Sequence, residues 1–280
     1  MARVKIAVVG CGYVGLVTAL GFARAGAEVL AVEVDPARRA ALRAGRVPFG
    51  EPGLGALLRE VAPAVEGSVE AVAGADLVCV AVPTAPDASD PTEGVVRAAV
   101  RAGVGGVVLR GTLTPERAAA LAALAPTVAN PEFLREGHAL ADFLAPARVV
   151  IGGDAGVAAR LVELYARILD PGVPVVCTDL ASACVAKLAA NAMLAVRVAF
   201  ANEVGRWASA SGASVVDVLH VVGLDPRIGP SHLRPSLGFG GPCLPKDARM
   251  LAPHSRLVAA ALECNDDQLR WAEQAAAGAA

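Results

Sequence analysis

Lys5-Ile6-Ala7-Val8-Val9-Gly10-Cys11-Gly12-Tyr13-Val14-Gly15 is the stretch that decides the fold of this 280-residue chain. Its first five residues form an apolar run typical of a buried parallel strand, and a helical pattern follows at residues 16–25. The glycines between them have the spacing G-x-G-x-x-G. In a strand-turn-helix unit these glycines permit a tight turn, the close approach of a pyrophosphate and the packing of helix on strand, so the stretch predicts a dinucleotide site.

A second apolar run, residues 28–32, ends at Glu33, where a carboxylate suits the ribose hydroxyls of the dinucleotide. The charge of Glu33 favours NAD over NADP, because it repels a 2′-phosphate. Arg38 and Arg39 follow closely and keep NADP open as an alternative. The residues that we expect to bind NAD are Gly10, Gly12, Tyr13, Val14, Gly15, Glu33, Thr84 and Thr112.

Further strand-like runs alternate with helical or loop-like segments such as residues 37–44 and 115–124. This alternation predicts an α/β fold with a Rossmann-type, doubly wound parallel sheet. Residues 83–86 and Thr112 follow two of the strands, at the edge of the sheet where ligands bind. Thr112 could hydrogen-bond a substrate or water there, or stabilise a local turn. The further predicted strands are residues 77–82, 107–109, 149–152 and 173–176.

From Asp179 the pattern changes to one long Ala-rich helix that reaches about Ser211 and is stopped by Gly212; a second helix follows at residues 215–222. We therefore predict a Rossmann domain over residues 1–178 and a helical domain over 179–280. Small side chains would let two copies of the long helix, residues 179–211, approach closely, which favours a homodimer. These side chains are those of Ala181, Ala183, Ala186, Ala189, Ala190 and Ala195.

The composition argues against several classes of partner. The chain has 25 basic and 27 acidic side chains and no basic run, so nothing favours nucleic acid or an anionic membrane. No apolar run reaches the roughly 18 residues of a membrane span, and glycines interrupt the signal-like residues 1–27. Six scattered cysteines favour a reducing cytoplasm and no structural metal. We expect a soluble cytoplasmic protein with a small-molecule ligand.

A reactive cysteine is predicted within Gly238-Phe239-Gly240-Gly241-Pro242-Cys243-Leu244-Pro245-Lys246-Asp247. The glycines let the backbone approach a ligand closely. Pro245 suits the first position of a helix, which would place Cys243 just before the helix N-terminus, where free N–H groups and the dipole favour a thiolate. The alternative is a structural thiol buried in a turn.

Only three of the 25 basic side chains are lysines, Lys5, Lys187 and Lys246, which indicates that lysine has a specific role. Lys187 lies one helical turn before Asn191, so both side chains project from one face of the long helix and a substrate hydroxyl could meet both. The alternative is a lysine that extends to solvent beside a solvated Asn191. For Lys246 we expect a local ion pair or solvation.

Several motifs occur together and in order, and with them the chain closely resembles the UDP-glucose/GDP-mannose dehydrogenase family from about residue 3 to about residue 251. The resemblance implies oxidation of a primary alcohol on a nucleotide sugar to a carboxylate, with two NAD used in succession and a thioester on the enzyme. The motifs are residues 51–54, 130–137, 187–191, 202–203, 225–229 and 238–247.

The resemblance also implies a role for each site residue. Lys187 and Asn191 would hold the developing oxyanion, and Cys243 would capture the aldehyde as a thiohemiacetal. Asp247 would orient Lys187 or nearby water, Glu132 would be the base in hydrolysis, and Thr112 would help to position the water. The substrate contacts would include Glu136, Gly240 and Arg227, the last reaching across a dimer interface.

The chain departs from the family pattern at three places. Relatives continue through a further domain that holds the nucleotide, whereas this sequence ends at Ala280, so we expect that domain to be absent, supplied by a partner chain or lost from a fragment. The substrate therefore stays open between a nucleotide sugar and a nucleotide, with UDP-glucose as the default. Gly111-Thr112 replaces the usual Ser-Thr, and Ala85 stands where a proline-rich loop would continue.

Two other functions stay open. The chain could be a two-electron dehydrogenase of the 3-hydroxyacid type, which shares a lysine and an asparagine on a helix and needs no thiol. It could also be a non-catalytic remnant that binds NAD or a nucleotide.

Overall fold

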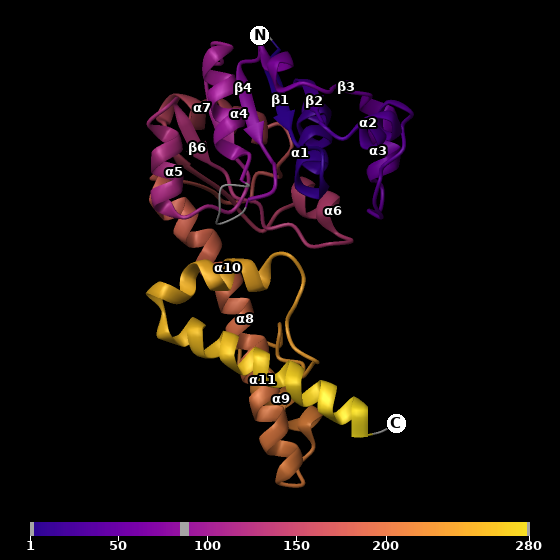
Figure 1. The fold of residues 1–280 in the computed structure, drawn as a ribbon, viewed down its shortest axis with the longest axis vertical. Coiled ribbons are helices and arrows are strands. Elements are labelled where there is room, and N and C mark those ends of the chain that lie inside the picture. Colours follow the sequence, from indigo (N-terminus) through magenta and orange to yellow (C-terminus); the bar gives the residue numbers. More distant parts are fainter. Residues whose placement is uncertain (1–2, 85–89, 279–280) are drawn as a thin grey trace. The chain divides into compact units, whose positions relative to one another are not determined.

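The computed structural model describes residues 3–84 and 90–278 (Figure 1). The chain forms two compact units, residues 1–187 and residues 188–280. The predicted domain boundary at residues 178 and 179 stays a prediction. Ala85, one of the positions at which the sequence departs from the family pattern, lies outside the described residues.

The first unit is built on one eight-stranded sheet with the order β3-β2-β1-β4-β5-β6-β7-β8. All neighbouring strands are parallel except β6 and β7, which run antiparallel. The predicted Rossmann-type fold is confirmed, with a sheet that is mostly rather than wholly parallel. The strands are β1 (Lys5–Val9), β2 (Glu28–Val32), β3 (Ala64–Glu66), β4 (Leu77–Val80), β5 (Val107–Leu109), β6 (Thr127–Ala129), β7 (Val149–Gly153) and β8 (Val175–Thr178).

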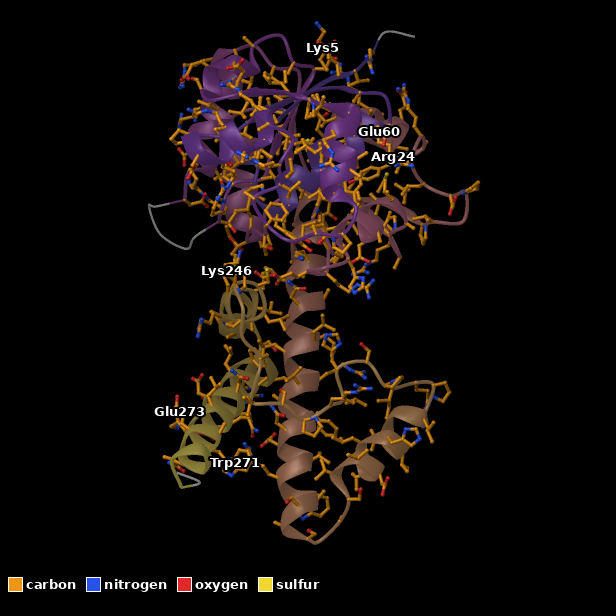
Figure 2. The ribbon with its side chains drawn as sticks, turned by 90° about the vertical axis from the view of Figure 1, so that its right-hand side faces the viewer. Lys5, Arg24, Glu60, Lys246, Trp271 and Glu273 are labelled. Carbon is orange, nitrogen blue, oxygen red and sulfur yellow. The ribbon has the colours of Figure 1, made fainter. Side chains whose placement is uncertain are left out.

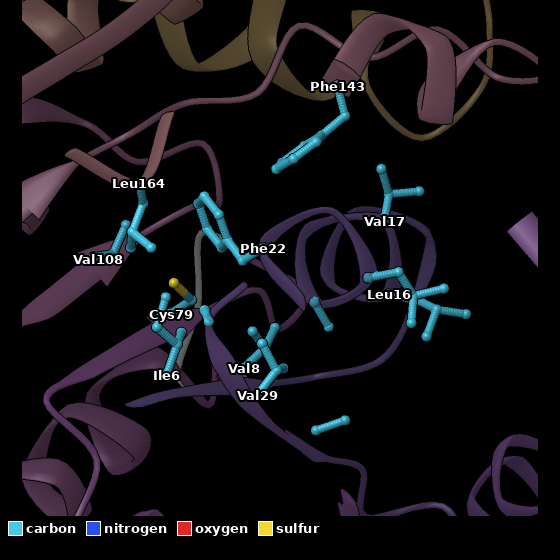
Figure 3. Packing of buried hydrophobic residues seen from close by; sticks show 14 of the residues in the cluster. Ile6, Val8, Leu16, Val17, Phe22, Val29, Cys79, Val108, Phe143 and Leu164 are labelled. Carbon is cyan, nitrogen blue, oxygen red and sulfur yellow. The ribbon is translucent and has the colours of Figure 1, made fainter. Parts of the chain in front are cut away.

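Side chains of the six inner strands alternate between two hydrophobic cores, one on each face of the sheet, because successive residues of a strand point to opposite sides. Ile6 and Val8 of β1 belong to the core that contains helix α1 (Figure 3), whereas Ala7 and Val9 belong to the core on the other face. The helices of this unit are α1 (Tyr13–Arg24), α2 (Pro36–Arg43), α3 (Leu54–Val61), α4 (Thr92–Arg101), α5 (Pro115–Ala122), α6 (Ala139–Leu144) and α7 (Ala155–Tyr165), with a short 3-10 helix η1 (Val69–Val72).

The long predicted helix is α8 (Leu180–Ala210). It begins where the Asp179 carboxylate accepts the backbone N–H of Ser182, and it ends before Gly212, whose φ of 73° is left-handed. The second unit also contains α9 (Val215–Leu224), α10 (Leu244–Leu251), the 3-10 helix η2 (Ala252–His254) and α11 (Arg256–Gly278). A third core joins α8, α10 and α11 through Ala192, Ala195, Ala199, Ala248, Val258 and Ala261.

Helix α8 is, by length and composition alone, apolar enough to cross a membrane, although the sequence had shown no apolar run of that length. Half of its most apolar 18-residue window is buried inside the protein. Ala183 and Cys184 fill the core on one face of the sheet, and Ala192 fills the third core. These contacts are those of a core helix.

Phe22 → Ala should be among the most destabilising single substitutions in the first unit. Phe22 is fully buried and packs edge to face on both Phe143 and Tyr165, with ring centroids 5.5 and 5.4 Å away. Loss of a buried phenyl ring leaves a cavity that costs roughly 3–5 kcal/mol. Denaturant unfolding should show this loss, while the exposed Val34 → Ala should unfold like the parent; equal midpoints for the two variants would contradict the packing described.

Candidate active site

The glycine turn after β1 leaves space for a phosphate group. A Cβ atom on Gly10 would lie 2.8 Å from the backbone oxygen of Ala81, and one on Gly15 would lie 1.7 Å from the oxygen of Gly10. A Cβ on Gly12 would meet no atom within 4 Å. Gly12 is the N-cap of α1 and forms no side-chain cap, so the first N–H groups of the helix are offered to a ligand. This geometry fits a pyrophosphate at the N-terminus of α1.

The carboxylate of Glu33 is buried at the end of β2. It accepts hydrogen bonds from the backbone N–H groups of Cys11 (3.1 Å) and Asp35 (2.9 Å), and it pairs with Arg38 at 3.0 Å. A carboxylate can accept about four hydrogen bonds, so capacity for a ribose hydroxyl remains. Burial, and next the charge of Glu33, raises the pKa of the Cys11 thiol to about 12, which makes this cysteine a structural one.

Tyr13, in the first turn of α1, is tied to the segment that follows β6. Its hydroxyl lies 2.7 Å from Glu51 Oε2 and 2.8 Å from the oxygen of Arg135, and it accepts the N–H of Gly137 at 2.9 Å. Burial, followed by the bond to Glu51, raises the pKa of Tyr13. Tyr13 therefore positions residues 135–137, while its predicted contact with the cofactor, like that of the neighbouring Val14, stays a prediction.

Thr84 and Thr112 follow β4 and β5 at the same edge of the sheet as the glycine turn. A Cβ on Gly111 would lie 2.7 Å from Thr84 Cγ2, so the two loops approach closely. A serine at this position would require the side chain of Thr84 to shift. Thr112 is buried at this edge.

Lys187 and Glu132 form a largely buried ion pair, with 6% and 12% of their side chains exposed. Lys187 Nζ lies 3.1 Å from Glu132 Oε1, donates to the backbone oxygen of Glu132 at 2.6 Å, and lies 5.2 Å from the centre of the Phe133 ring. Glu132 Oε2 accepts the N–H of Leu134 at 2.7 Å. Lys187 is thus not the solvent-directed lysine of the alternative interpretation.

Glu136, a predicted substrate contact, is exposed.

In the second unit, Cys243 is the N-cap of α10 and is exposed, as predicted from its position before a helix. Pro245 occupies the second rather than the first helical position. The buried carboxylate of Asp247 accepts a hydrogen bond from Asn191 Nδ2 at 2.6 Å, so Asn191 is not merely solvated. Lys246, which is labelled in Figure 2, lies 3.5 Å from Asp247, and this distance confirms the expected local ion pair.

The loop that leads to Cys243 is held by buried amide side chains, which sequence reasoning did not assign to the site. Asn265 accepts the N–H of Phe239 at 2.6 Å and donates to its oxygen at 3.1 Å. Asn202 accepts the N–H of Ser236 at 2.7 Å, and Gln268 donates to the oxygen of Ser236 at 2.9 Å. Asn265 and Gln268 are buried polar residues of α11, and their place on the inward face of this helix is the local signal that could have pointed to them.

Gly240 and Arg227, the remaining predicted substrate contacts, are exposed. A Cβ on Gly240 would meet no atom within 4 Å. Arg227 pairs with Asp225 at 2.6 Å, which raises the pKa of Arg227, and 87% of its side chain is exposed. The predicted substrate contacts of Gly240 and Arg227 stay predictions. Within residues 3–84 and 90–278, no cluster of three His, Cys, Asp or Glu side chains is arranged to hold a metal ion.

Comparison with known proteins follows the two units. Residues 4–169 match the NAD binding domain of the UDP-glucose/GDP-mannose dehydrogenase family, and residues 181–267 match the central domain of that family. A UDP-glucose dehydrogenase structure from Pyrobaculum islandicum has a TM-score of 0.88 and 37% identity over 98% of this chain and 70% of its own.

Curated relatives give the same result. The UDP-glucose 6-dehydrogenase of Rhizobium meliloti is 34% identical over 95% of this chain and 68% of its own length. The enzyme of the same name from Pseudomonas aeruginosa is 36% identical over 88% of this chain and 60% of its own. The chain therefore spans between three fifths and seven tenths of these relatives. These matches confirm two predictions from the sequence: the cofactor is NAD, and the chain is a dehydrogenase that acts on CH–OH donors. The chain belongs to the UDP-glucose/GDP-mannose dehydrogenase family.

Proposed function

We propose that the chain catalyses the NAD-dependent, four-electron oxidation of a primary alcohol on a nucleotide sugar to a carboxylate, with UDP-glucose as the first substrate to test. The arrangement that carries this proposal is an exposed thiol at the N-terminus of α10, one helical turn before the buried carboxylate of Asp247, which accepts a hydrogen bond from Asn191. A two-electron dehydrogenase has no use for that thiol. The buried Lys187–Glu132 pair supplies the polar groups that the other steps need.

In the first oxidation, the hydroxyl loses a proton and the carbon loses a hydride. NAD, when bound at the glycine turn, accepts the hydride in each of the two oxidations. We assign the developing oxyanion to Lys187 and Asn191, whose side chains are held in place by Glu132 and Asp247 respectively. Donors that are fixed beforehand stabilise the charge without reorganising.

The aldehyde is then captured by Cys243. The thiolate forms a C–S bond with the carbonyl carbon, and the oxygen takes up a proton to give a thiohemiacetal. Loss of a second hydride and of the hydroxyl proton gives a thioester. In hydrolysis, Glu132 removes a proton from water, the water oxygen forms the new C–O bond, and the C–S bond breaks to return the thiolate. Thr112 is the residue that we expect to help position this water.

A dimer through α8 is the second part of the proposal. Met193, Phe200 and Trp207 are spaced by seven residues, so they share one face of α8, and they are 56, 47 and 74% exposed. Such a stripe of large apolar side chains is typical of an interface. Two of the alanines predicted to form it, Ala183 and Ala195, are instead buried within the chain. Arg227 would then reach the site of the second copy.

The cytoplasmic location of the protein stays a prediction.

Gly12 → Ala should weaken NAD binding roughly tenfold or more while leaving the stability of the free protein unchanged, since the added methyl group enters the space left for the pyrophosphate. Gly15 → Ala should instead lower the melting temperature, because its methyl group meets backbone. Calorimetric titration with NAD and thermal unfolding distinguish the two. Unchanged NAD affinity in Gly12 → Ala would exclude this turn as the pyrophosphate site.

Two NADH should form per carboxylate product, and Glu132 → Gln should accumulate an acylated enzyme that intact mass spectrometry detects. Cys243 → Ala should abolish carboxylate formation, because no thiohemiacetal can form. The matched control is Cys177 → Ala, since Cys177 is the other exposed cysteine among the described residues. One NADH per product with a free carbonyl, or full turnover in Cys243 → Ala, would reject the proposed mechanism.

Trp207 → Glu should convert a dimer into a monomer in light scattering at micromolar concentration, since a carboxylate cannot be buried in an apolar stripe without a partner. The control Val34 → Glu adds the same charge at an exposed site of the first unit and should leave the mass unchanged. A monomeric parent protein would contradict the proposed interface and would remove Arg227 from a neighbouring site.

A further inference from the structure

The loop before α10 has little stiffness of its own. Residues 238–243, Gly-Phe-Gly-Gly-Pro-Cys, contain three glycines, and Gly238 and Gly241 have positive φ angles of 125° and 75°. Glycine has more backbone freedom to lose on folding than any other residue, so a loop of this composition is fixed only where contacts from outside hold it. The loop ends at Cys243, the proposed nucleophile, so the position of the sulfur depends on such contacts.

Asn265, in α11, binds both backbone polar groups of Phe239. Its Oδ1 accepts the N–H of Phe239 at 2.6 Å, and its Nδ2 donates to the oxygen of Phe239 at 3.1 Å. The two residues are 4% and 5% exposed, and Phe239 belongs to the third core. A Cβ on Gly238 would lie 2.9 Å from Asn265 Oδ1, so the amide approaches the loop closely. A buried peptide group that loses its partners is costly, so this pair holds the loop at one residue.

Two further buried amides hold the chain at Ser236, before the loop. Asn202 of α8 accepts the N–H of Ser236 at 2.7 Å, and Gln268 of α11 donates to its oxygen at 2.9 Å. Arg206 donates to Gln268 Oε1 at 2.5 Å, which leaves the Nε2 of Gln268 for Ser236. The contact at Phe239 lies nearer to the end of the loop than the contacts at Ser236, so its loss should free the thiol most.

A separate anchor holds the loop at its other end. The oxygen of Cys243 accepts the N–H of Asp247 at 2.9 Å, and the buried carboxylate of Asp247 accepts a hydrogen bond from Asn191 at 2.6 Å. Loss of the Asn265 contact would leave this anchor and the N-terminus of α10 in place, and would free the segment before the thiol. The thiolate would keep the favourable helix N-terminus, while the sulfur would occupy a wider range of positions.

We propose that Asn265 is a positioning residue, which holds Cys243 where its sulfur captures the aldehyde before the aldehyde dissociates. The inference rests on the proposed function. The aldehyde formed in the first oxidation has two fates: formation of the C–S bond leads to the thiohemiacetal and then to the carboxylate, whereas dissociation gives a free aldehyde. Attack requires the sulfur within about 3–3.5 Å of the carbonyl carbon, so the ratio of the two fates depends on how firmly the loop is held.

Asn265 → Ala should release free aldehyde during the oxidation of UDP-glucose. A misplacement of about 1 Å slows a reaction step roughly 100-fold, so capture should no longer outrun dissociation. NADH, carboxylate and aldehyde, the last as its semicarbazone, are measured together. The parent should give two NADH per carboxylate and no aldehyde, and the variant more than two. This ratio does not depend on how much of the variant is folded, so a loss of stability alone cannot change it.

The alkylation of Cys243 by iodoacetamide separates position from nucleophilicity. It is followed by intact mass in a Cys177 → Ala background, because Cys177 is also exposed. Asn265 → Ala should be alkylated within about twofold of the parent rate, since the exposure of the thiol and its place at the helix N-terminus are unchanged.

Two controls match this variant. Asp266 → Ala removes the exposed neighbouring side chain of α11, and Leu219 → Ala removes a buried side chain of α9; both should keep two NADH per carboxylate. If Asn265 → Ala does not fold, Gln268 → Leu, which loses the bond to Ser236, should release aldehyde instead. An unchanged ratio in the folded amide variants, or loss of thiol alkylation in Asn265 → Ala, would overturn the proposal. A parent that gives one NADH per free aldehyde would reject the proposed function and this inference together.

Discussion

The buried ion pair between Lys187 and Glu132 is the constraint on which the first unit's part of the site depends. Taking two charges out of water costs several kcal/mol per ion, so such a pair persists only where the geometry and extra hydrogen bonds compensate. Here the backbone oxygen of Glu132 and the N–H of Leu134 provide those bonds, and Phe133 lies beside the ammonium. The pair fixes the first turns of α8 to the segment after β6, and removal of either partner would leave the other charge buried.

The topology of the sheet explains why the remaining groups of this unit gather with that pair. Parallel strands end at the same edge, so this edge brings together the turn after β1, Thr84 after β4, Thr112 after β5 and Glu132 after β6. The first and last of these, Gly10 and Glu132, are 122 positions apart in the sequence. The close approach of Gly111 to Thr84 and of Gly15 to Gly10 leaves little freedom in this edge. A rigid sheet edge is what a hydride acceptor and a polar pair need to keep a fixed separation.

Features that depend on residues close together in the sequence could be predicted from it. The glycine spacing, Glu33 at a strand end, the long helix stopped by Gly212, and Cys243 before a helix are written in neighbouring residues. The short strands β3 and β6 were not predicted, because each has a polar residue among its three, whereas the equally short β5 is wholly apolar and was predicted. No local signal reports that β7 runs antiparallel to β6. The cluster around Asn265 joins residues from distant elements, so the same polar residue types could equally have been solvated.

The environments of the cysteines support the assignment of the proposed thiol chemistry to Cys243. Burial is the main cause that raises the pKa of four other thiols. The pKa is raised to about 12 for Cys11 and Cys79 and to about 11 for Cys184, and it is also raised for Cys264. A raised pKa leaves less thiolate at neutral pH, which disfavours a nucleophile. Cys177 is exposed but lies within the edge strand β8, where it is not itself the N-cap of a helix. Cys243 combines exposure with a position at the N-terminus of α10, and Asn265 holds the backbone of Phe239 in the loop that leads to it.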